Sequence, residues 1–190
     1  YALKSPGLSN LMGTDELGRD VFLRTLSGAS LSLRISLFAW FASIILGLFL
    51  GSLAGYYSGT LIDEFITFLI NYAYATPFIV FLICLLGVVG AGLTNAYIIL
   101  ALFAWAAPAR QAKVLVREVR YAKFVMASKS FGFSTTGLLY GIIIPYILKP
   151  ILFASLAALP EIIALDAGLS FFGLGVQPPT PSLGKMISDG

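Results

Sequence analysis

The chain has 190 residues, of which 58% are hydrophobic and only 11% are charged, and its mean hydropathy is +0.93. These values lie outside the range of soluble globular domains and indicate an integral membrane protein. With one cysteine and no histidine, the sequence excludes disulfides, histidine-based triads and zinc sites, so we expect no catalytic, cofactor-binding or metal-binding residues. It also lacks a phosphate-binding loop of the Gly-x-x-x-x-Gly-Lys-Ser/Thr type, so any coupled ATP hydrolysis would belong to a separate chain.

Residues 1–30 are polar and rich in turn-forming residues. Acidic and basic side chains alternate between Asp15 and Arg24, which suits an ion-paired cap at the entrance of a helix. Thr14 or Asp15 would be the N-cap of that helix. The alternative is merely a solvated charged face.

The first membrane span is predicted at 33–57, where Arg34 is the only charged residue in 25 positions. At ~1.5 Å per residue, a helix of this length crosses the ~30 Å hydrocarbon core of a bilayer. Small residues recur at every fourth position of this span, and they include Gly47, Gly51 and Gly55. Such a stripe lets two membrane helices approach closely, so we expect it to pack against a helix rather than to contact a substrate.

A second span is predicted at 65–89, and four polar residues precede Pro77 within it: Asn71, Tyr72, Tyr74 and Thr76. Backbone groups that a proline frees inside a membrane helix must be satisfied by protein or in a water-lined cavity. These side chains are therefore candidates to line a translocation pathway. Plain hydrogen bonding between helices is the equal alternative.

A third span is predicted to begin at 96–107 and to continue past Pro108 as a basic helical extension, and a fourth span is predicted at 138–159. Proline interrupts the hydrogen bonding of a helix, so ends or kinks are expected at Pro108, Pro145, Pro150 and Pro160. Lys149 lies ~16 Å into the fourth span at helical rise. An ionisable group at that depth either faces a pathway or a partner, or extends its long stem toward the cytoplasm.

Between the third and fourth spans lies the most basic stretch of the chain, with six of its twelve basic residues: Arg110, Lys113, Arg117, Arg120, Lys123 and Lys129. Such enrichment marks the cytoplasmic side of a membrane protein, so the net charge of +3 reports topology rather than nucleic-acid binding. A short helix is predicted at 124–131, with Gly132 just past its end. The next helix has candidate N-caps at Ser134, Thr135 and Thr136.

The segment at 161–175 is apolar, but it is too short and too rich in glycine for a confident span, and it leads into a proline-rich run. We expect 161–190 to form a re-entrant or interfacial segment.

Three stretches together resemble binding-protein-dependent ABC importer permeases. Residues 13–33 are similar to the Gly-Thr-Asp-x-x-Gly-Arg-Asp-Val signature of dipeptide, oligopeptide and nickel permeases, with Ser30 where a basic residue is usual. Residues 169–184 are similar to a second signature of the same permeases, with Leu183 where tryptophan is usual. The central basic loop resembles the family's coupling loop, although Met126 stands where the family usually has glutamate.

The resemblance implies an all-α, polytopic membrane helix bundle of the type I ABC importer permease kind. Residues 1–30 would be an extracytoplasmic segment, and 31–190 the permease domain with about four visible spans and a coupling loop at 121–136. The protein would lie in a prokaryotic plasma (inner) membrane, with 110–134 in the cytoplasm and 1–30 and 169–190 outside. Both termini are expected to be truncated, because family members carry a further span on each side.

In function, the resemblance implies a permease subunit of an ATP-driven importer of peptides or nickel that works by alternating access. Its expected partners are a homologous second permease, two cytoplasmic ABC ATPase subunits, an extracytoplasmic substrate-binding protein and membrane lipid, but no nucleic acid. The residues expected to couple it to the ATPase are Lys123, Met126, Ala127, Ser128 and Gly132. The alternative for this loop is simple attraction of its basic residues to anionic lipid.

Two other functions remain open from the sequence. An ATPase-independent secondary transporter or channel would need carboxylates or a histidine relay within the membrane, whereas the acidic residues lie near predicted span ends. An intramembrane aspartyl protease would need a second mid-span aspartate to pair with Asp166. The sequence does not distinguish dipeptides, oligopeptides, glutathione or a nickel chelate as the substrate.

Overall fold

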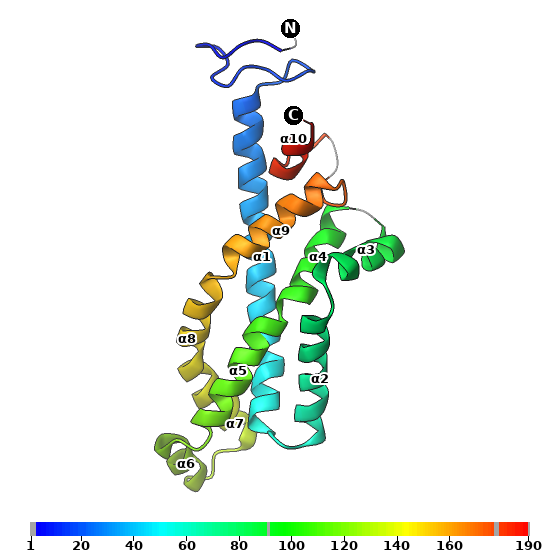
Figure 1. Ribbon diagram of the computed structural model, residues 1–190. Helices are drawn as coiled ribbons and strands as arrows, with labels where there is room; N and C mark the ends of the chain where they lie inside the picture. Colours follow the sequence, from blue (N-terminus) through cyan, green and yellow to red (C-terminus); the bar gives the residue numbers. More distant parts are fainter. Residues whose placement is uncertain (1–2, 91, 177–178, 190) are drawn as a thin grey trace.

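A computed structural model describes residues 3–90, 92–176 and 179–189 of the chain (Figure 1). Within these residues the regular structure is helical. The elements are α1 (Val21–Tyr56), α2 (Leu61–Ala75), α3 (Phe78–Val89), α4 (Leu93–Ala104), α5 (Ala106–Val119), α6 (Lys123–Ser130), α7 (Thr135–Leu138), the π-helical turn η1 (Leu139–Ile143), α8 (Ile144–Leu156), α9 (Leu159–Phe171) and α10 (Leu183–Asp189).

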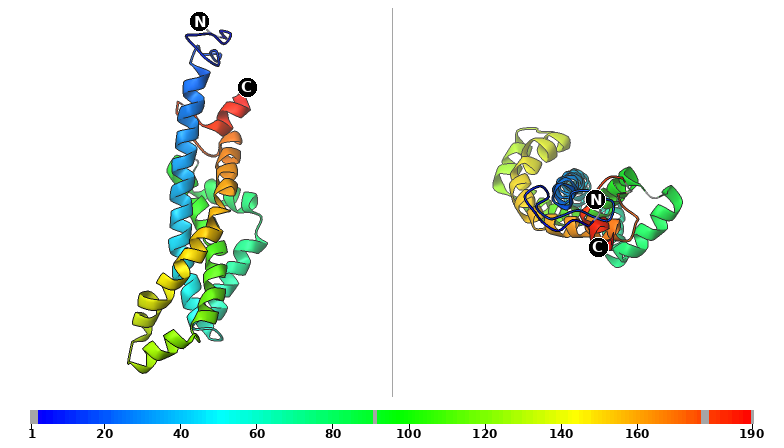
Figure 2. Two further views of the ribbon diagram at one scale, coloured as in Figure 1. Left: turned by 90° about the vertical axis from the view of Figure 1, so that its left-hand side faces the viewer. Right: turned by 90° about the horizontal axis from the view of Figure 1, so that it is seen from above.

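The long helix α1 is the axis of the molecule, and the other helices pack along it (Figures 1 and 2). The N-terminal loop and α10 lie at one end of α1, and α6 and α7 lie at the other. Helix α1 starts well before the span expected at 33–57, because the Asp20 carboxylate accepts a hydrogen bond from the Leu23 N–H at 3.1 Å and caps the helix. The expectation of an N-cap at Thr14 or Asp15 was therefore wrong.

Helices α1 and α5 meet along the stripe of glycines on α1. A methyl group added at Gly47 would lie 2.7 Å from Pro108 Cγ, and one added at Gly55 would lie 2.5 Å from the Lys113 carbonyl oxygen. On the facing side of α5, Ala109 and Ala112 are completely buried. The two backbones are thus too close for any side chain larger than hydrogen at these glycines.

Helix α2 is tied to α5 by a polar cluster at its start. The Lys113 ammonium lies 2.6 Å from Asp63 Oδ1 and donates to Thr67 Oγ1 at 2.6 Å. The other Asp63 oxygen accepts the Gly59 N–H at 3.0 Å, so the same carboxylate also closes the turn between α1 and α2. A lysine of the basic stretch therefore pairs with an acid of α2 and fastens α5 to that helix.

The second span differs from the prediction, because 65–89 is not one straight helix. The axes of Leu61–Ala75 and Val80–Val89 differ in direction by 103° across the break that contains Pro77. Proline has no N–H to donate and clashes with the preceding turn, which explains a break at this position. The pair is either a broken span or a re-entrant loop.

The third span continues past Pro108 into the basic helical extension, whereas the fourth span ends earlier than expected. Ile98–Val119 is one candidate span that continues past Pro108, which lies in the first turn of α5, where a missing N–H costs little. Thr135–Leu156 is the next candidate span, with η1 just before Pro145. Pro160 does not close it, since that residue lies in the first turn of α9.

Helix α9 is the apolar segment for which a re-entrant or interfacial path was expected. It has 13 residues and is ~20 Å long, which is too short to cross a bilayer. It runs alongside α1 and α4, and α10 packs back onto it (Figure 1). Residues 177–178 and 190 of the expected proline-rich segment lie outside the described residues.

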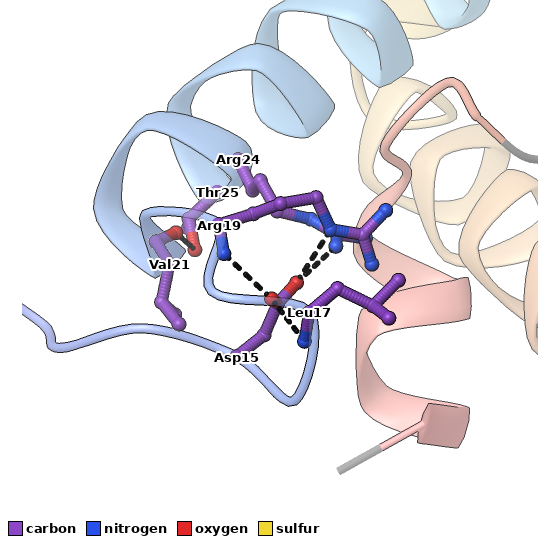
Figure 3. Close-up of polar contacts among 6 residues, drawn as sticks. All are labelled: Asp15, Leu17, Arg19, Val21, Arg24 and Thr25. Atoms are coloured by element: carbon purple, nitrogen blue, oxygen red, sulfur yellow. Dashed lines mark hydrogen bonds and ion pairs between the residues drawn. The ribbon is translucent and has the colours of Figure 1, made fainter. Parts of the chain in front are cut away.

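The loop before α1 is organised around the Asp15 carboxylate (Figure 3). It accepts the N–H groups of Leu17 and Arg19 at 3.0 and 2.8 Å, and it pairs with the side chains of Arg19 and Arg24. Partial desolvation raises the pKa of Asp15, but these hydrogen bonds and the charge of Arg19 outweigh it and lower the pKa from 3.8 to about 2. Asp15 is thus the centre of an ion-paired loop rather than the helix cap.

The first prediction concerns the contact between α1 and α5. Gly51→Leu should lower the free energy of unfolding by about 1–3 kcal/mol or more, because its side chain would collide with the Ala109 backbone. Thermal unfolding of the detergent-solubilised protein measures the change. Gly87→Ala is the matched control, since an added methyl group there meets no atom within 4 Å. Equal destabilisation by both substitutions would contradict the close contact.

The second prediction concerns the pH dependence of the Asp15 loop. Because the folded pKa is lower than the usual one, the loop is fully stabilised above about pH 4, and this contribution is lost as pH falls toward about 2. Amide exchange at Leu17 and Arg19, corrected for intrinsic rates, should therefore rise only in that acidic range. Asp15→Asn should raise it several-fold at pH 7, whereas Glu16→Gln should not. Unchanged exchange in Asp15→Asn would refute the role of the carboxylate.

Candidate functional site

Helix α6 lies at the end of the molecule opposite the N-terminal loop, outside the helical bundle (Figures 1 and 2). At its C-terminal end, the Gly132 N–H donates to the Lys129 carbonyl at 3.0 Å and the Phe133 N–H donates to the Ser128 carbonyl at 3.4 Å. Gly132 has φ of +87°, a conformation that suits glycine. Ser134 then caps α7 by accepting the Gly137 N–H at 3.2 Å. The chain thus turns between α6 and α7, with Gly132 ending the first helix and Ser134 starting the second.

One face of α6 packs against the rest of the chain and the other face is exposed. Val125 is buried in an apolar cluster that includes residues of α1, α5, α7 and α8, whereas Met126 is 56% exposed. The remaining residues expected to contact an ATPase are Lys123, Ala127 and Ser128; the first two are exposed and the third is half-buried. An open cavity of about 650 Å³ lies between α6 and the ends of α1 and α5. Helix α6 therefore presents a small, mixed apolar and basic surface beside a hollow.

Arg120 connects this corner to α1, a role that the sequence did not indicate. Its Nη1 donates to the Tyr56 carbonyl at 2.6 Å, at the C-terminal end of α1. Its guanidinium also lies over the Tyr121 ring, 4.5 Å from the ring centre. A cation at the C-terminus of a helix interacts favourably with the helix dipole and with carbonyls that have no partner in the helix. Arg120 thus fastens the elbow between α5 and α6 to the end of α1.

The residues proposed to line a pathway are not brought together. Asn71 and Tyr72 are exposed on α2, and the Thr76 hydroxyl donates to the Tyr72 carbonyl of its own helix at 2.9 Å. Lys149 is exposed on α8. Of this set, Tyr74 lines a cavity between the helices; it is 54% exposed, and the Arg110 guanidinium lies 5.5 Å from its ring centre.

This cavity, called the central cavity below, has a volume of about 310 Å³ and is open on the side of its exposed residues Tyr74, Gln111 and Glu161. Its walls come from α1, α2, α4, α5, α8 and α9, and they include Trp40, Tyr74, Phe103, Gln111, Ser155 and Glu161. Nothing in the sequence groups these residues. They lie far apart along the chain, and the apolar pattern of the spans contains no signal for which residues share a cavity.

Known proteins resemble the chain over most of its length. The family described as "Binding-protein-dependent transport system inner membrane component" matches residues 43–190. The dipeptide transport system permease protein DppC of Alkalihalophilus pseudofirmus is 36% identical over 98% of the chain, and the oligopeptide permease OppC of Bacillus subtilis is 34% identical over 98%. In both cases the chain spans 61% of the relative's length.

The fold has a counterpart among solved structures. An inward-facing structure of the MetNI methionine ABC transporter matches with a TM-score of 0.71 and 20% sequence identity, over 87% of this chain and 79% of that one. The expected fold class, an all-α membrane helix bundle of the type I ABC importer permease kind, is confirmed. Since the family match covers residues 43–190, the chain belongs to the binding-protein-dependent transport system inner membrane components.

Proposed function

We propose that this chain is part of a permease subunit of an ATP-driven peptide importer. The observation that carries the proposal is the exposed helix α6, which leaves the bundle at its most basic end and terminates at Gly132. The similarity to dipeptide and oligopeptide permeases over 98% of the chain supports peptides rather than nickel as the substrate class. A secondary transporter or channel is not favoured, because it leaves the form of α6 unexplained.

Helix α6 would dock on a cytoplasmic ATPase and move with it. Its small residue Ala127 would allow close contact, and Met126 would supply an adaptable apolar contact without a salt bridge. Arg120 would pass the movement to α1, because it binds the carbonyl end of that helix directly. Movement of α1 and α5 as one packed unit would then open the bundle to either side of the membrane in turn.

The partners and the orientation belong to the same proposal. The chain would pair with a homologous permease and work with two ATPases and an extracytoplasmic binding protein in a prokaryotic inner membrane. Residues 110–134 would be cytoplasmic, and residues 1–30 and 169–190 would be extracytoplasmic. The opposite placement of α6 and of the N-terminal loop supports this orientation (Figure 1). Membrane lipid would surround the spans.

A third prediction tests the role of α6. Ala127→Glu should place a charge in the ATPase contact, and Gly132→Val should strain the helix end by about 1–2 kcal/mol, because a β-branched residue disfavours positive φ. Both variants should insert and assemble normally. Both should nevertheless lose peptide uptake and ligand-stimulated ATP hydrolysis together, as measured in proteoliposomes containing the complete transporter.

The control for this experiment is Gly141→Ala, because a methyl group there also meets no atom within 4 Å and the residue does not require positive φ. It should retain uptake and ATP hydrolysis. Normal coupling of hydrolysis to uptake in both α6 variants would place the ATPase contact elsewhere.

A fourth prediction tests the orientation. In a Cys84→Ser background, single cysteines are placed at Phe131, which is 85% exposed, and at Thr180, which is also exposed. An impermeant maleimide applied to intact cells should label Thr180→Cys, and it should label Phe131→Cys only after permeabilisation. Equal labelling of the two positions in intact cells would exclude this topology.

A further inference from the structure

Asp166 is buried on the side of α9 that faces α1, and only 1% of its surface is exposed. Ile162 and Leu169, four positions before it and three after it, lie on the same face of α9. Both pack in an apolar cluster with Ile35 and Ala39 of α1, and the two helices run side by side (Figure 1). The Asp166 carboxyl group is therefore enclosed by helices, and it does not line the central cavity.

The polar groups around Asp166 leave its carboxyl group unsatisfied. Both carboxyl oxygens are buried and have no hydrogen-bond partner among the described residues. The Ser32 side chain of α1 acts on the carboxyl group without forming a well-aligned hydrogen bond, and the Ser36 hydroxyl, one turn further along α1, is also buried and unpaired. The hydroxyls of Ser170 and Ser182 each already accept a backbone N–H. The facing side of α1 thus offers hydroxyl groups, which can accept a hydrogen bond from a protonated acid.

The charged side chains of α1 and α9 do not compensate a negative charge on Asp166. On α1, Arg24 is paired with Asp15, and Arg34 is exposed. On α9, Glu161 is exposed and lies five positions earlier, on another face of the helix. The two helices that enclose the carboxyl group therefore bring no cation to it.

The other helices that pack against α9 are α10 and α4. The charged residues of α10 are Lys185 and Asp189, and Lys185 donates no hydrogen bond to either oxygen of Asp166. Helix α4 has no acidic or basic residue, and its titratable residue is Tyr97. Within the part of the chain that the structure describes, no positive charge acts on Asp166.

These surroundings favour the neutral form of the Asp166 side chain. An ionised carboxylate there is costly, because it loses its water without gaining a cation or N–H donors. Burial favours the protonated acid, which avoids this cost. The acid also has an O–H group that can donate to the Ser32 hydroxyl on the facing helix.

We propose that Asp166 is a proton-binding site, and that its neutral carboxylic acid fastens α9 to α1. Loss of the proton would leave a negative charge between the helices and loosen α9. Ala158, Ile162 and Leu165 of α9 belong to the wall of the central cavity, so the protonation state of Asp166 sets how firmly this wall is held. This inference goes beyond the proposed function and does not depend on which substrate is carried.

The test measures amide exchange of residues 162–169 between about pH 5 and pH 8, corrected for intrinsic rates, in the complete transporter in nanodiscs. Opening of α9 exposes Asp166 to water, where an aspartate is ionised above about pH 4. The opened state then binds fewer protons than the packed state, so packing weakens as the pH rises. Protection of residues 162–169 should therefore fall about tenfold over this range, whereas that of α5 should not. Protection of α9 that does not change with pH would overturn the proposal.

Two variants assign the effect to one side chain. Asp166→Asn has the size of the neutral acid but cannot ionise, so its α9 protection should not depend on pH, and at pH 8 it should exceed that of the wild type about tenfold. Glu161→Gln removes the exposed acid of the same helix and should keep the wild-type pH dependence. Wild-type pH dependence in Asp166→Asn would overturn the assignment.

Infrared difference spectra between the wild type and Asp166→Asn detect the proton directly. At about pH 6 an ordinary aspartate is ionised, so the C=O stretch of a protonated carboxylic acid should appear only if Asp166 is held neutral. We expect this band at pH 6 and its loss at alkaline pH, and its absence at pH 6 would overturn the proposal. Protection of α9 that follows the Na⁺ concentration at constant pH would also overturn it, because a bound metal cation would then compensate an ionised Asp166.

Discussion

The close approach of α1 and α5 at Gly47, Gly51 and Gly55 is the constraint on which the rest of the structure depends. Between helices in a bilayer there is no hydrophobic drive, so association relies on tight packing of small residues. Once the two backbones are in contact, the faces of α5 are fixed. Lys113 then meets α2, Gln111 faces the central cavity, and Arg120 reaches the end of α1.

Charged side chains that lie between the helices are paired, because an unpaired charge is costly in a medium of low polarity. Asp63 and Lys113 satisfy one another and also fasten the turn between α1 and α2. Arg120 satisfies carbonyls that the end of α1 leaves free. Glu161 lies exposed in the first turn of α9, where the positive end of the helix dipole favours a carboxylate.

Helix α5 links the central cavity to helix α6. Its first turn, with Pro108, forms part of the wall of the central cavity, and its last residues lead through Arg120 into α6. A helix of 14 residues packed along α1 behaves as a stiff element. Under the proposed function, displacement of α6 by a partner would therefore also move the wall of the central cavity.

Local sequence determined the membrane class, the glycine stripe, the short helix before Gly132 and an N-cap within 134–136, because composition, periodicity and turn chemistry act over a few residues; the structure selects Ser134. It did not reveal the bend between α2 and α3 or the cap at Asp20, because a proline shows only where a helix can break, and several hydroxyl and acidic residues before α1 could have capped it. Tertiary structure alone decided the polar contacts between helices. Lys113 meets Thr67 across 46 positions and Arg120 meets Tyr56 across 64, and Glu161 shares a cavity with Trp40 only because three broken helices pack around the middle of α1.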